Sequence, residues 1–373
     1  MENKQLTVDA EQLRKWLEEY KDIVVLDVRP KEQREEWQIP GSVYVDAYDR
    51  LNANDFSVLD QVTIPENVPV ITVCAAGRTS MIAAKELRKK GIEGYSLEGG
   101  MKAWSMAWNT ATLTWENLTI IQFRRTGKGC LSYMVVSEKE AILIDASLPI
   151  DAYERTLTAQ RLSLKFTMDT HIHADHLSRS KQLADKFNVP LYLPAQNKVA
   201  FSFQPLTNDD ILTVGNVSIR SIHTPGHTLE STSYLINDEI IVTGDTLFID
   251  SIGRPDLKSS TEEAKHKASL LFHSLRKILS LDDHIILLPG HTSKPVEFNN
   301  IPIQASLASV KQNVSILSMG EEEFVQTILQ RIPPTPANYL AIVESNLAGE
   351  YDNVNPTDLE AGANRCSISL KKF

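Results

Sequence analysis

Three imidazoles and one carboxylate fall within six consecutive residues, His171-Ile172-His173-Ala174-Asp175-His176. The chain has nine histidines in 373 residues, so this segment alone holds a third of them. The residues before it, 166–170, predict the end of a strand. The residues after it, 177–187, predict a helix in which Leu183 and Phe187 share one face. We therefore expect the cluster in a strand-to-helix loop, where several side chains can point at one centre.

Imidazole nitrogens and carboxylate oxygens are ligands for a borderline divalent metal such as zinc or iron. Three later segments end predicted strands with the same residue types: His223-Thr224-Pro225-Gly226-His227-Thr228 after 217–222, Gly244-Asp245 at the end of 240–245, and Pro289-Gly290-His291 after 285–288. Taken singly, His227 or Asp245 fits a turn or a capping role. The ordered set predicts instead that one sheet edge gathers all of these side chains around metal.

Size and composition limit the function classes. A chain of 373 residues, 42% hydrophobic and 23% charged, is expected to form two or three globular domains. The net charge of −10 argues against a general nucleic-acid binder. We find no apolar run of membrane-spanning length and no secretory signal, and three widely spaced cysteines do not suggest a disulfide framework. The expectation is a cytoplasmic enzyme without a nucleic-acid or membrane partner.

Strands and helices alternate over the first 108 residues, which predicts a small parallel α/β unit. The predicted elements are a helix over 10–20, strands over 23–28 and 68–73, a helix over 80–90, and a strand over 94–97.

The loop Cys74-Ala75-Ala76-Gly77-Arg78-Thr79-Ser80 joins the strand ending at 73 to the following helix. Free N–H groups at a helix N-terminus, together with Arg78, favour a thiolate over a thiol, which lowers the pKa and raises reactivity. Gly77 lets the loop curl around a sulfur attached to Cys74, and the same N–H groups would hold the outer sulfur of a persulfide. From this loop alone, a small buried cysteine at a strand end is an equally good interpretation.

The surrounding motifs favour the first interpretation. In order, Leu26-Asp27-Val28-Arg29, Ile39-Pro40-Gly41-Ser42-Val43, the Cys74 loop, and Leu97-Glu98-Gly99-Gly100-Met101-Lys102-Ala103-Trp104 resemble a single rhodanese domain over residues 5–108. The resemblance implies that Cys74 is the catalytic sulfur carrier, cycling between thiolate and persulfide. The persulfide cradle would be Ala75, Ala76, Gly77, Arg78 and Thr79. The second loop position, often basic or polar in the family, is Ala75 here, which leaves the sulfur donor open.

We expect the rhodanese domain over 1–108, a linker without regular structure over 109–116, and a second domain over 117–373. The second domain is predicted to open with strands over 118–123, 131–136 and 141–145, then a helix over 152–161 and a strand over 191–193. One or two helices are expected over 305–330, followed by a proline-rich stop and a tail without a motif. In this scheme Cys130 is a strand residue, and Cys366 is a structural or exposed thiol.

The ordered series His-x-His-x-Asp-His, Pro-Gly-His, Gly-Asp and Pro-Gly-His resembles the metallo-β-lactamase fold over about residues 115–295. The resemblance implies an αββα sandwich with the metal at one edge, so the full fold class is α/β, with a rhodanese-like parallel unit before the sandwich. Within that fold, Gly244-Asp245-Thr246-Leu247-Phe248-Ile249 and Gly253-Arg254-Pro255-Asp256-Leu257 resemble persulfide dioxygenases. Glyoxalase II enzymes share Gly-Asp and Gly-Arg there but usually continue with Phe-Glu.

The persulfide dioxygenase pattern implies that His171, His227 and Asp245 bind one Fe(II) per chain, with open positions for dioxygen and the substrate sulfur. Arg254 would contact substrate. The remaining cluster residues would orient ligands or water; these are His173, Asp175, His176 and His291. In a two-zinc hydrolase all seven would be direct ligands, and the residue types do not separate the two uses. The sequence differs from the usual family pattern at Leu229-Glu230-Ser231 and at Thr292-Ser293. Both segments are expected at the rim of the pocket, so the identity of the substrate stays open.

Together these features predict iron-dependent oxidation of a low-molecular-weight persulfide, such as glutathione persulfide, by O2 to sulfite and thiol. Cys74 would shuttle sulfur among the persulfide, sulfite and thiosulfate. The expected partners are these small molecules, and a homo-oligomer is common in the resembled family. The alternatives are a two-zinc, glyoxalase II-like thioester hydrolase beside a rhodanese, and a sensing module without turnover. Retention of every expected ligand and of Cys74 argues against the sensor.

Overall fold

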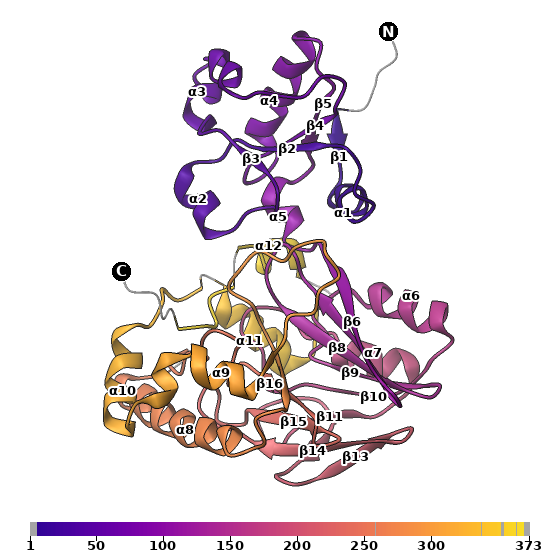
Figure 1. Ribbon diagram of the computed structural model, residues 1–373, viewed down its shortest axis with the longest axis vertical. Coiled ribbons are helices and arrows are strands. Elements are labelled where there is room, and N and C mark those ends of the chain that lie inside the picture. The colour runs from indigo at the N-terminus through magenta and orange to yellow at the C-terminus, as the bar shows by residue number, and fades with distance from the viewer. Residues whose placement is uncertain (1–5, 258, 337, 352–353, 363, 369–373) are drawn as a thin grey trace.

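A computed structural model describes residues 6–257, 259–336, 338–351, 354–362 and 364–368, and it shows two parts stacked along the long axis (Figure 1). The first part is a five-stranded sheet of parallel pairs in the order β1-β5-β4-β2-β3. Its elements are β1 (Thr7–Val8), α1 (Ala10–Glu18), β2 (Val24–Asp27), α2 (Lys31–Glu36), β3 (Val43–Tyr44), α3 (Tyr48–Asn52), the 3-10 helix η1 (Phe56–Gln61), β4 (Val70–Val73), α4 (Arg78–Lys89), β5 (Gly94–Leu97) and α5 (Gly100–Trp104).

The elements predicted for this part are confirmed with small shifts at their ends. Helix α1 begins after Asp9, whose carboxylate accepts the Gln12 amide at 2.7 Å, as an N-cap does. The apolar strand β4 is buried along its whole length because helices cover both faces of the parallel sheet. The Cys74 loop therefore leaves the middle of a rigid sheet.

The second part is an αββα sandwich, as predicted. A seven-stranded sheet, β12-β11-β10-β9-β8-β7-β6, faces a six-stranded sheet, β13-β14-β15-β16-β17-β18. The elements of the sandwich are β6 (Asn109–Trp115), β7 (Leu118–Arg124), β8 (Leu131–Ser137), β9 (Glu140–Ile144), α6 (Ile150–Gln160), β10 (Ser163–Met168), α7 (Ser180–Phe187), β11 (Leu191–Pro194), β12 (Gln204–Leu206), β13 (Ile211–Val214), β14 (Val217–His223), β15 (Thr232–Ile236), β16 (Ile240–Gly244), α8 (Thr261–Leu279), β17 (Ile286–Pro289) and β18 (Ala305–Ser306).

Three apolar layers hold the sandwich together. Ile120 and Ile236 belong to the layer between the sheets. Tyr153 and Leu183 join helices α6 and α7 to the outer face of the first sheet, and Leu271 of α8 packs on the outer face of the second. The chain then continues through α9 (Leu307–Asn313), the 3-10 helix η2 (Ser315–Ser318), α10 (Glu321–Gln330), α11 (Tyr339–Ala348) and α12 (Pro356–Leu359).

The prediction of a linker without regular structure over 109–116 was wrong. Residues 109–115 form strand β6, which pairs antiparallel with β7 along its whole length. Ala111 and Leu113 are buried, whereas Thr112 and Thr114 are exposed, so the segment alternates with the period of a half-buried strand. Three threonines and a tryptophan among these seven residues made this alternation hard to recognise in the sequence.

The two parts contact each other directly. The Trp37 indole N–H donates to the Thr126 carbonyl at 3.0 Å, and the Tyr20 hydroxyl donates to the Phe298 carbonyl at 2.6 Å. The buried Arg125 guanidinium donates to the Ser105 carbonyl at 2.8 Å. Only four residues, 105–108, separate α5 from β6, so little chain is left for independent movement. Among the described residues, no helix has both the length and the apolar character needed to cross a bilayer.

Candidate functional site

The four predicted ligand segments meet at one edge of the sandwich. The His171 loop follows β10, and the segments that carry His227, Asp245 and His291 follow β14, β16 and β17. His171, His227 and Asp245 offer ligand atoms that all lie within 4.8 Å of one another, and all three side chains are buried. The structure thus brings together the three residues expected to bind one metal ion.

Two of the three ligand atoms have no hydrogen-bond partner. The buried atoms His171 Nε2 and Asp245 Oδ2 are both unpaired. Asp245 Oδ2 lies 3.8 Å from His171 Nε2 and 3.5 Å from His227 Nε2, so the three atoms converge. A buried polar atom without a partner costs free energy, which a metal ion bound among these atoms would remove.

The outer nitrogens of the two imidazoles are held in place. His227 Nδ1 lies 2.7 Å from the Arg254 carbonyl oxygen, and His171 Nδ1 lies 2.9 Å from the Thr170 hydroxyl. Metal-binding imidazoles generally use their second nitrogen in this way, because the contact fixes the ring and its tautomer. The arrangement leaves Nε2 of each ring for a metal.

Charge at the three residues also suits a metal. Burial lowers the pKa of both His171 and His227, and the neighbouring His173 lowers the His171 pKa further, so both rings are neutral. Burial alone would raise the pKa of Asp245, but the His291 imidazole outweighs it and holds that pKa well below its usual range. Two neutral imidazoles and one carboxylate are the protonation states in which these groups bind metal.

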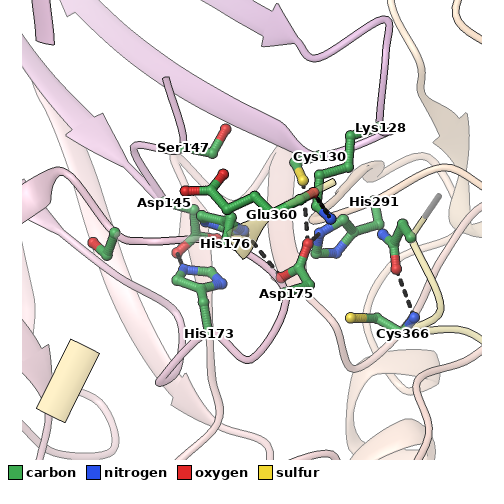
Figure 2. Close-up of polar contacts among 12 residues, drawn as sticks. Lys128, Cys130, Asp145, Ser147, His173, Asp175, His176, His291, Glu360 and Cys366 are labelled. Atoms are coloured by element: carbon green, nitrogen blue, oxygen red, sulfur yellow. Dashed lines mark hydrogen bonds and ion pairs between the residues drawn. The ribbon is translucent and has the colours of Figure 1, made fainter. Parts of the chain in front are cut away.

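A second cluster beside the triad is bonded mainly to itself (Figure 2). The two oxygens of Asp175 lie 3.0 Å from His176 Nδ1 and 2.9 Å from His291 Nε2. His291 Nδ1 lies 2.5 Å from Asp245 Oδ1, so His291 links the second cluster to the triad. Burial would lower the pKa of His291, but Asp245 and Asp175 outweigh it and raise that pKa well above its usual value. His291 is therefore a cation between two carboxylates.

Cys130 belongs to this second cluster, a role that its sequence context did not indicate. It lies one residue before β8 and forms an isolated bridge with His291, and its thiol donates to Asp175 Oδ2 at 3.2 Å. The prediction that Cys130 is a strand residue was therefore off by one position. Cys366 is also buried, with its sulfur close to Asp245 and His291, so it is not an exposed thiol.

His173 points to a different partner from the other histidines. Its Nε2 lies 3.2 Å from Asp145 Oδ1, and Asp145 also accepts the Thr170 amide at 2.7 Å and the Thr170 hydroxyl at 2.8 Å. Asp145 therefore shapes the start of the metal loop. Sequence reasoning identified Asp145 only as a strand end, although a carboxylate after the buried strand β9 is the same signal that identified Asp245.

A cavity of about 260 Å³ opens beside the triad at His227. Leu229 and Leu257 supply apolar wall, and Lys198 and Lys267 supply positive charge. The unusual segment Leu229-Glu230 lines this cavity, as predicted for the rim. Glu230 is buried and accepts from the Lys198 ammonium at 3.0 Å.

Arg254, predicted to contact substrate, does not reach this cavity. Its side chain is fully buried, and its guanidinium donates to both Asp256 oxygens, at 2.8 and 2.7 Å, and to the Pro333, Pro334 and Arg365 carbonyls. The structure corrects the prediction: the Arg254 side chain fastens the C-terminal segment, and only its backbone carbonyl touches the metal site. Sequence reasoning placed the motif correctly but could not show that the guanidinium is already saturated.

The Cys74 loop joins β4 to α4 as predicted. The Gly77 amide donates to Cys74 Sγ at 3.2 Å, and the Ser80 hydroxyl donates to it at 3.3 Å. Gly77 has a left-handed φ of 87°, which lets the loop turn back over the sulfur. Ala75, Ala76 and Arg78 are exposed on the loop. Both contacts stabilise negative charge on the sulfur.

Two details of the predicted cradle change. The Thr79 side chain is buried and donates to Asn52 Oδ1 at 3.2 Å, so its hydroxyl does not contact Cys74 Sγ. Ser80, which was not assigned a role, contacts the sulfur instead and is fixed by Ser96 at 2.8 Å. A hydroxyl six residues after the cysteine, one turn into the helix, was the available signal.

The C-terminal segment, in which no motif was found, holds the metal loop. Asn346 donates to the His173 and His176 carbonyls, both at 2.9 Å. Glu360 is buried against the Arg125 guanidinium and accepts the Leu177 amide at 3.1 Å. These contacts come from residues more than 160 positions away from the loop, so sequence patterns could not reveal them.

Comparison with known proteins agrees with both halves of this description. Residues 9–107 match the rhodanese-like domain, and residues 125–291 match the metallo-beta-lactamase superfamily. The chain is 30% identical over 196 residues to the probable polyketide biosynthesis zinc-dependent hydrolase BaeB of Bacillus velezensis, covering 51% of this chain and 81% of BaeB.

Two solved structures resemble the fold. A metallo-beta-lactamase from Staphylococcus aureus subsp. aureus COL superposes with a TM-score of 0.58 at 27% identity, over 63% of this chain and 74% of that one. ETHE1 from Myxococcus xanthus superposes with a TM-score of 0.54 at 26% identity, over 65% of this chain and 99% of ETHE1. The chain therefore belongs to the metallo-beta-lactamase superfamily, and a rhodanese-like domain precedes its superfamily fold.

Proposed function

We propose that the sandwich domain oxidises a low-molecular-weight persulfide with dioxygen at a single Fe(II), and that Cys74 carries sulfur to or from the small molecules of this reaction. The observation that carries the proposal is the contrast between the two clusters. In the triad, His171 Nε2 and Asp245 Oδ2 are buried and unpaired. In the second cluster, both oxygens of Asp175 and both ring nitrogens of His291 are already paired, although His176 Nε2 is buried and unpaired as well.

This contrast favours one metal ion over two. His291 uses both ring nitrogens, one on Asp175 and one on Asp245. His173 Nε2 is likewise taken up by Asp145. A second ion held by Asp175 and His291 would have to displace the contact between them, although His173 Nδ1 and His176 Nε2 are unpaired. An ion in the triad displaces none of these contacts. Two histidines and one carboxylate are the donor set of non-haem Fe(II) oxygenases.

His171, His227 and Asp245 would hold the iron, which would supply the redox chemistry and free coordination positions for dioxygen and the substrate sulfur. The reaction balances as one persulfide, one dioxygen and one water giving one thiol, one sulfite and two protons. Leu229 and Leu257 would shield the reacting sulfur from bulk water. Lys267 would bind a carboxylate of the thiol carrier, as glutathione provides, whereas Lys198 is already paired with Glu230.

The two domains would then handle linked species. Sulfite attacks the outer sulfur of a Cys74 persulfide, a new sulfur–sulfur bond forms, and thiosulfate leaves as Cys74 returns to the thiolate. The Gly77 amide and the Ser80 hydroxyl would stabilise that thiolate. Sulfite made in one domain is thus an acceptor for the other.

Metal analysis and an oxygen electrode test the proposal. Protein purified without oxygen should contain about one iron per chain, and it should consume oxygen when glutathione persulfide is added. Sulfite should appear in proportion to the oxygen consumed. Failure of iron-loaded protein to consume oxygen with any small persulfide would refute the proposed oxidation.

A two-zinc thioester hydrolase is the second candidate. The observation in its favour is that all seven possible ligands are present and that a relative is named as a zinc-dependent hydrolase. There a metal-activated water would attack the thioester carbonyl. Two zinc ions per chain together with hydrolysis of a glutathione thioester would establish this function in place of the oxidation.

A further inference from the structure

A cavity of about 440 Å³ lies where the Cys74 loop faces the sandwich domain. Ala75 and Ala76, the two residues after Cys74, form one wall together with Met101. The opposite wall comes from the sandwich domain, through Gly127 and the C-terminal pair Ala361-Gly362. The sulfur-carrier loop therefore opens onto the other domain.

Contacts between the domains hold the two walls in position. Lys102 of the first wall pairs with Asp358, and Glu36 pairs with Arg365. The Trp37 indole N–H donates to the Thr126 carbonyl at 3.0 Å beside the same cavity. The cavity is thus a fixed part of the fold.

Backbone hydrogen bonds fix the Cys74 loop against helix α5 at this wall of the cavity. The amides of Met101 and Lys102 donate to the carbonyls of Cys74 and Ala75 at 2.9 and 3.0 Å. These bonds tie the loop carbonyls to the start of α5, while the Gly77 amide remains on the sulfur. Cys74 is 2% exposed and does not itself line the cavity, so an acceptor bound there would reach a sulfur attached to Cys74 past Ala75 and Ala76, while the Gly77 amide stays on Sγ.

The size and lining of the cavity indicate an organic ligand. Pockets for small organic molecules measure roughly 300–1,000 Å³, whereas sulfite or cyanide needs only a small fraction of that. Trp37, Met101 and Ala361 give the lining an apolar character. Its charged members are Arg29, Glu36 and Lys102, and Lys102 is also paired with Asp358. These features suit a low-molecular-weight thiol with a carboxylate.

We propose that this cavity binds the organic thiol that exchanges sulfur with Cys74, and that Ala361 of the sandwich domain limits which thiols fit. The inference rests on the sulfur-carrier role proposed above. In the step, the thiol loses its proton and the thiolate attacks the outer sulfur of the Cys74 persulfide. A sulfur–sulfur bond forms to the acceptor, the bond to Sγ breaks, and its electron pair stays on Sγ. The product is an organic persulfide, with no net oxidation.

Size-dependent kinetics of an Ala361→Trp variant test the proposal. Ala361 is exposed, so the larger ring can project into the cavity without entering the core. With thiosulfate as donor, we expect the KM for glutathione to rise at least tenfold while the KM for cyanide changes less than twofold. Ala361→Leu should give an intermediate rise, which keeps the test valid if the tryptophan variant folds poorly.

Two controls separate the cavity from other effects. Ala53→Trp places the same ring on an exposed position of the first domain, next to α3, and should leave both acceptors unchanged. Iron content and oxygen uptake of all variants should match those of the wild type. An unchanged glutathione KM in Ala361→Trp, or equal losses with both acceptors, would overturn the cavity assignment. Absence of cyanide transfer in the wild type would instead refute the sulfur-carrier role, and the cavity assignment with it.

Discussion

The Cys74 site and the metal triad are built in opposite ways. Both contacts to Cys74 Sγ come from the next six residues, so one strand-to-helix junction makes the whole site. The triad takes its members from positions 171, 227 and 245, each after a different strand. A local site depends mainly on its own loop, whereas an assembled site depends on every contact that keeps the strand ends in register. The two sites should therefore fail separately, and for different reasons.

Replacement of Cys74 should give the largest effect and leave the triad intact. In Cys74→Ser, thiosulfate–cyanide sulfur transfer should fall at least about a thousandfold, because a hydroxyl forms no persulfide. Oxygen uptake with glutathione persulfide should stay within about twofold of the wild type. Loss of oxygen uptake in a variant that still folds and binds iron would show that the two sites are not independent.

Replacement of His171 should give the reverse pattern. His171→Ala removes one of three ligands, so it should lower iron content and reduce oxygen uptake at least about a hundredfold. That loss exceeds the effect of removing a group that only hydrogen-bonds to a metal ligand. Sulfur transfer by Cys74 should persist. The control is His284→Ala, since His284 is an exposed histidine in the same domain. Full iron occupancy in His171→Ala would contradict the assigned ligand set.

Glu360 tests how far the assembled site depends on distant contacts. Its carboxylate and the Arg125 guanidinium are both fully buried. Glu360→Gln leaves that guanidinium without its countercharge, and breaking a buried ion pair in this way costs about 3–5 kcal/mol. Thermal unfolding should show the loss, and iron occupancy should fall because Glu360 also accepts the Leu177 amide in the metal loop.

Glu350→Gln is the matched control for this variant. Glu350 is exposed in the same C-terminal segment, and an exposed charge of this kind contributes less than about 1 kcal/mol. Equal unfolding temperatures for the two variants would show that the buried pair does not stabilise the site.

The same contrast explains what the sequence could predict. Strand β4, the loop and α4 follow from an apolar run, a glycine and a helical period, all within about 20 residues. The triad was also predictable, because each ligand follows a recognisable strand and carries a motif. Asn346, Glu360 and Asp145 were missed, since their roles depend on which segments pack together. Arg254 shows the opposite error: a correct motif whose guanidinium is used up by Asp256, two residues away, and by carbonyls some 80 to 110 positions away.

Two glycines, Gly77 and Gly91, test how far the Cys74 site depends on its own loop. Gly77 and Gly91 both have left-handed φ values, 87° and 80°. A Cβ at Gly77 would lie 3.1 Å from the Gly99 nitrogen and 3.3 Å from the Leu97 oxygen, whereas a Cβ at Gly91 would meet nothing within 4 Å. Gly77→Ala should cost about 1–3 kcal/mol and Gly91→Ala clearly less. Denaturant unfolding should show the difference, and only Gly77→Ala should slow sulfur transfer. Equal effects would mean that backbone strain alone decides both positions.

The smallest expected effect is a pH dependence at the cavity beside the triad. Burial lowers the pKa of Lys267 to about 8, although Asp256 and Glu230 oppose the shift. Lys267 is therefore a cation below pH 8 and becomes neutral above it. Binding of an anionic persulfide should weaken over that range, so its KM should rise a few-fold between pH 7 and 9.

Lys267→Met should remove this rise, since its side chain carries no charge at either pH. Lys267→Arg should also remove it by staying charged, with a lower KM than the methionine variant. Lys265→Met, at an exposed position of the same helix, should keep the wild-type profile. A rise that survives in both Lys267 variants would place the titrating group elsewhere and would leave Lys267 without a part in substrate binding.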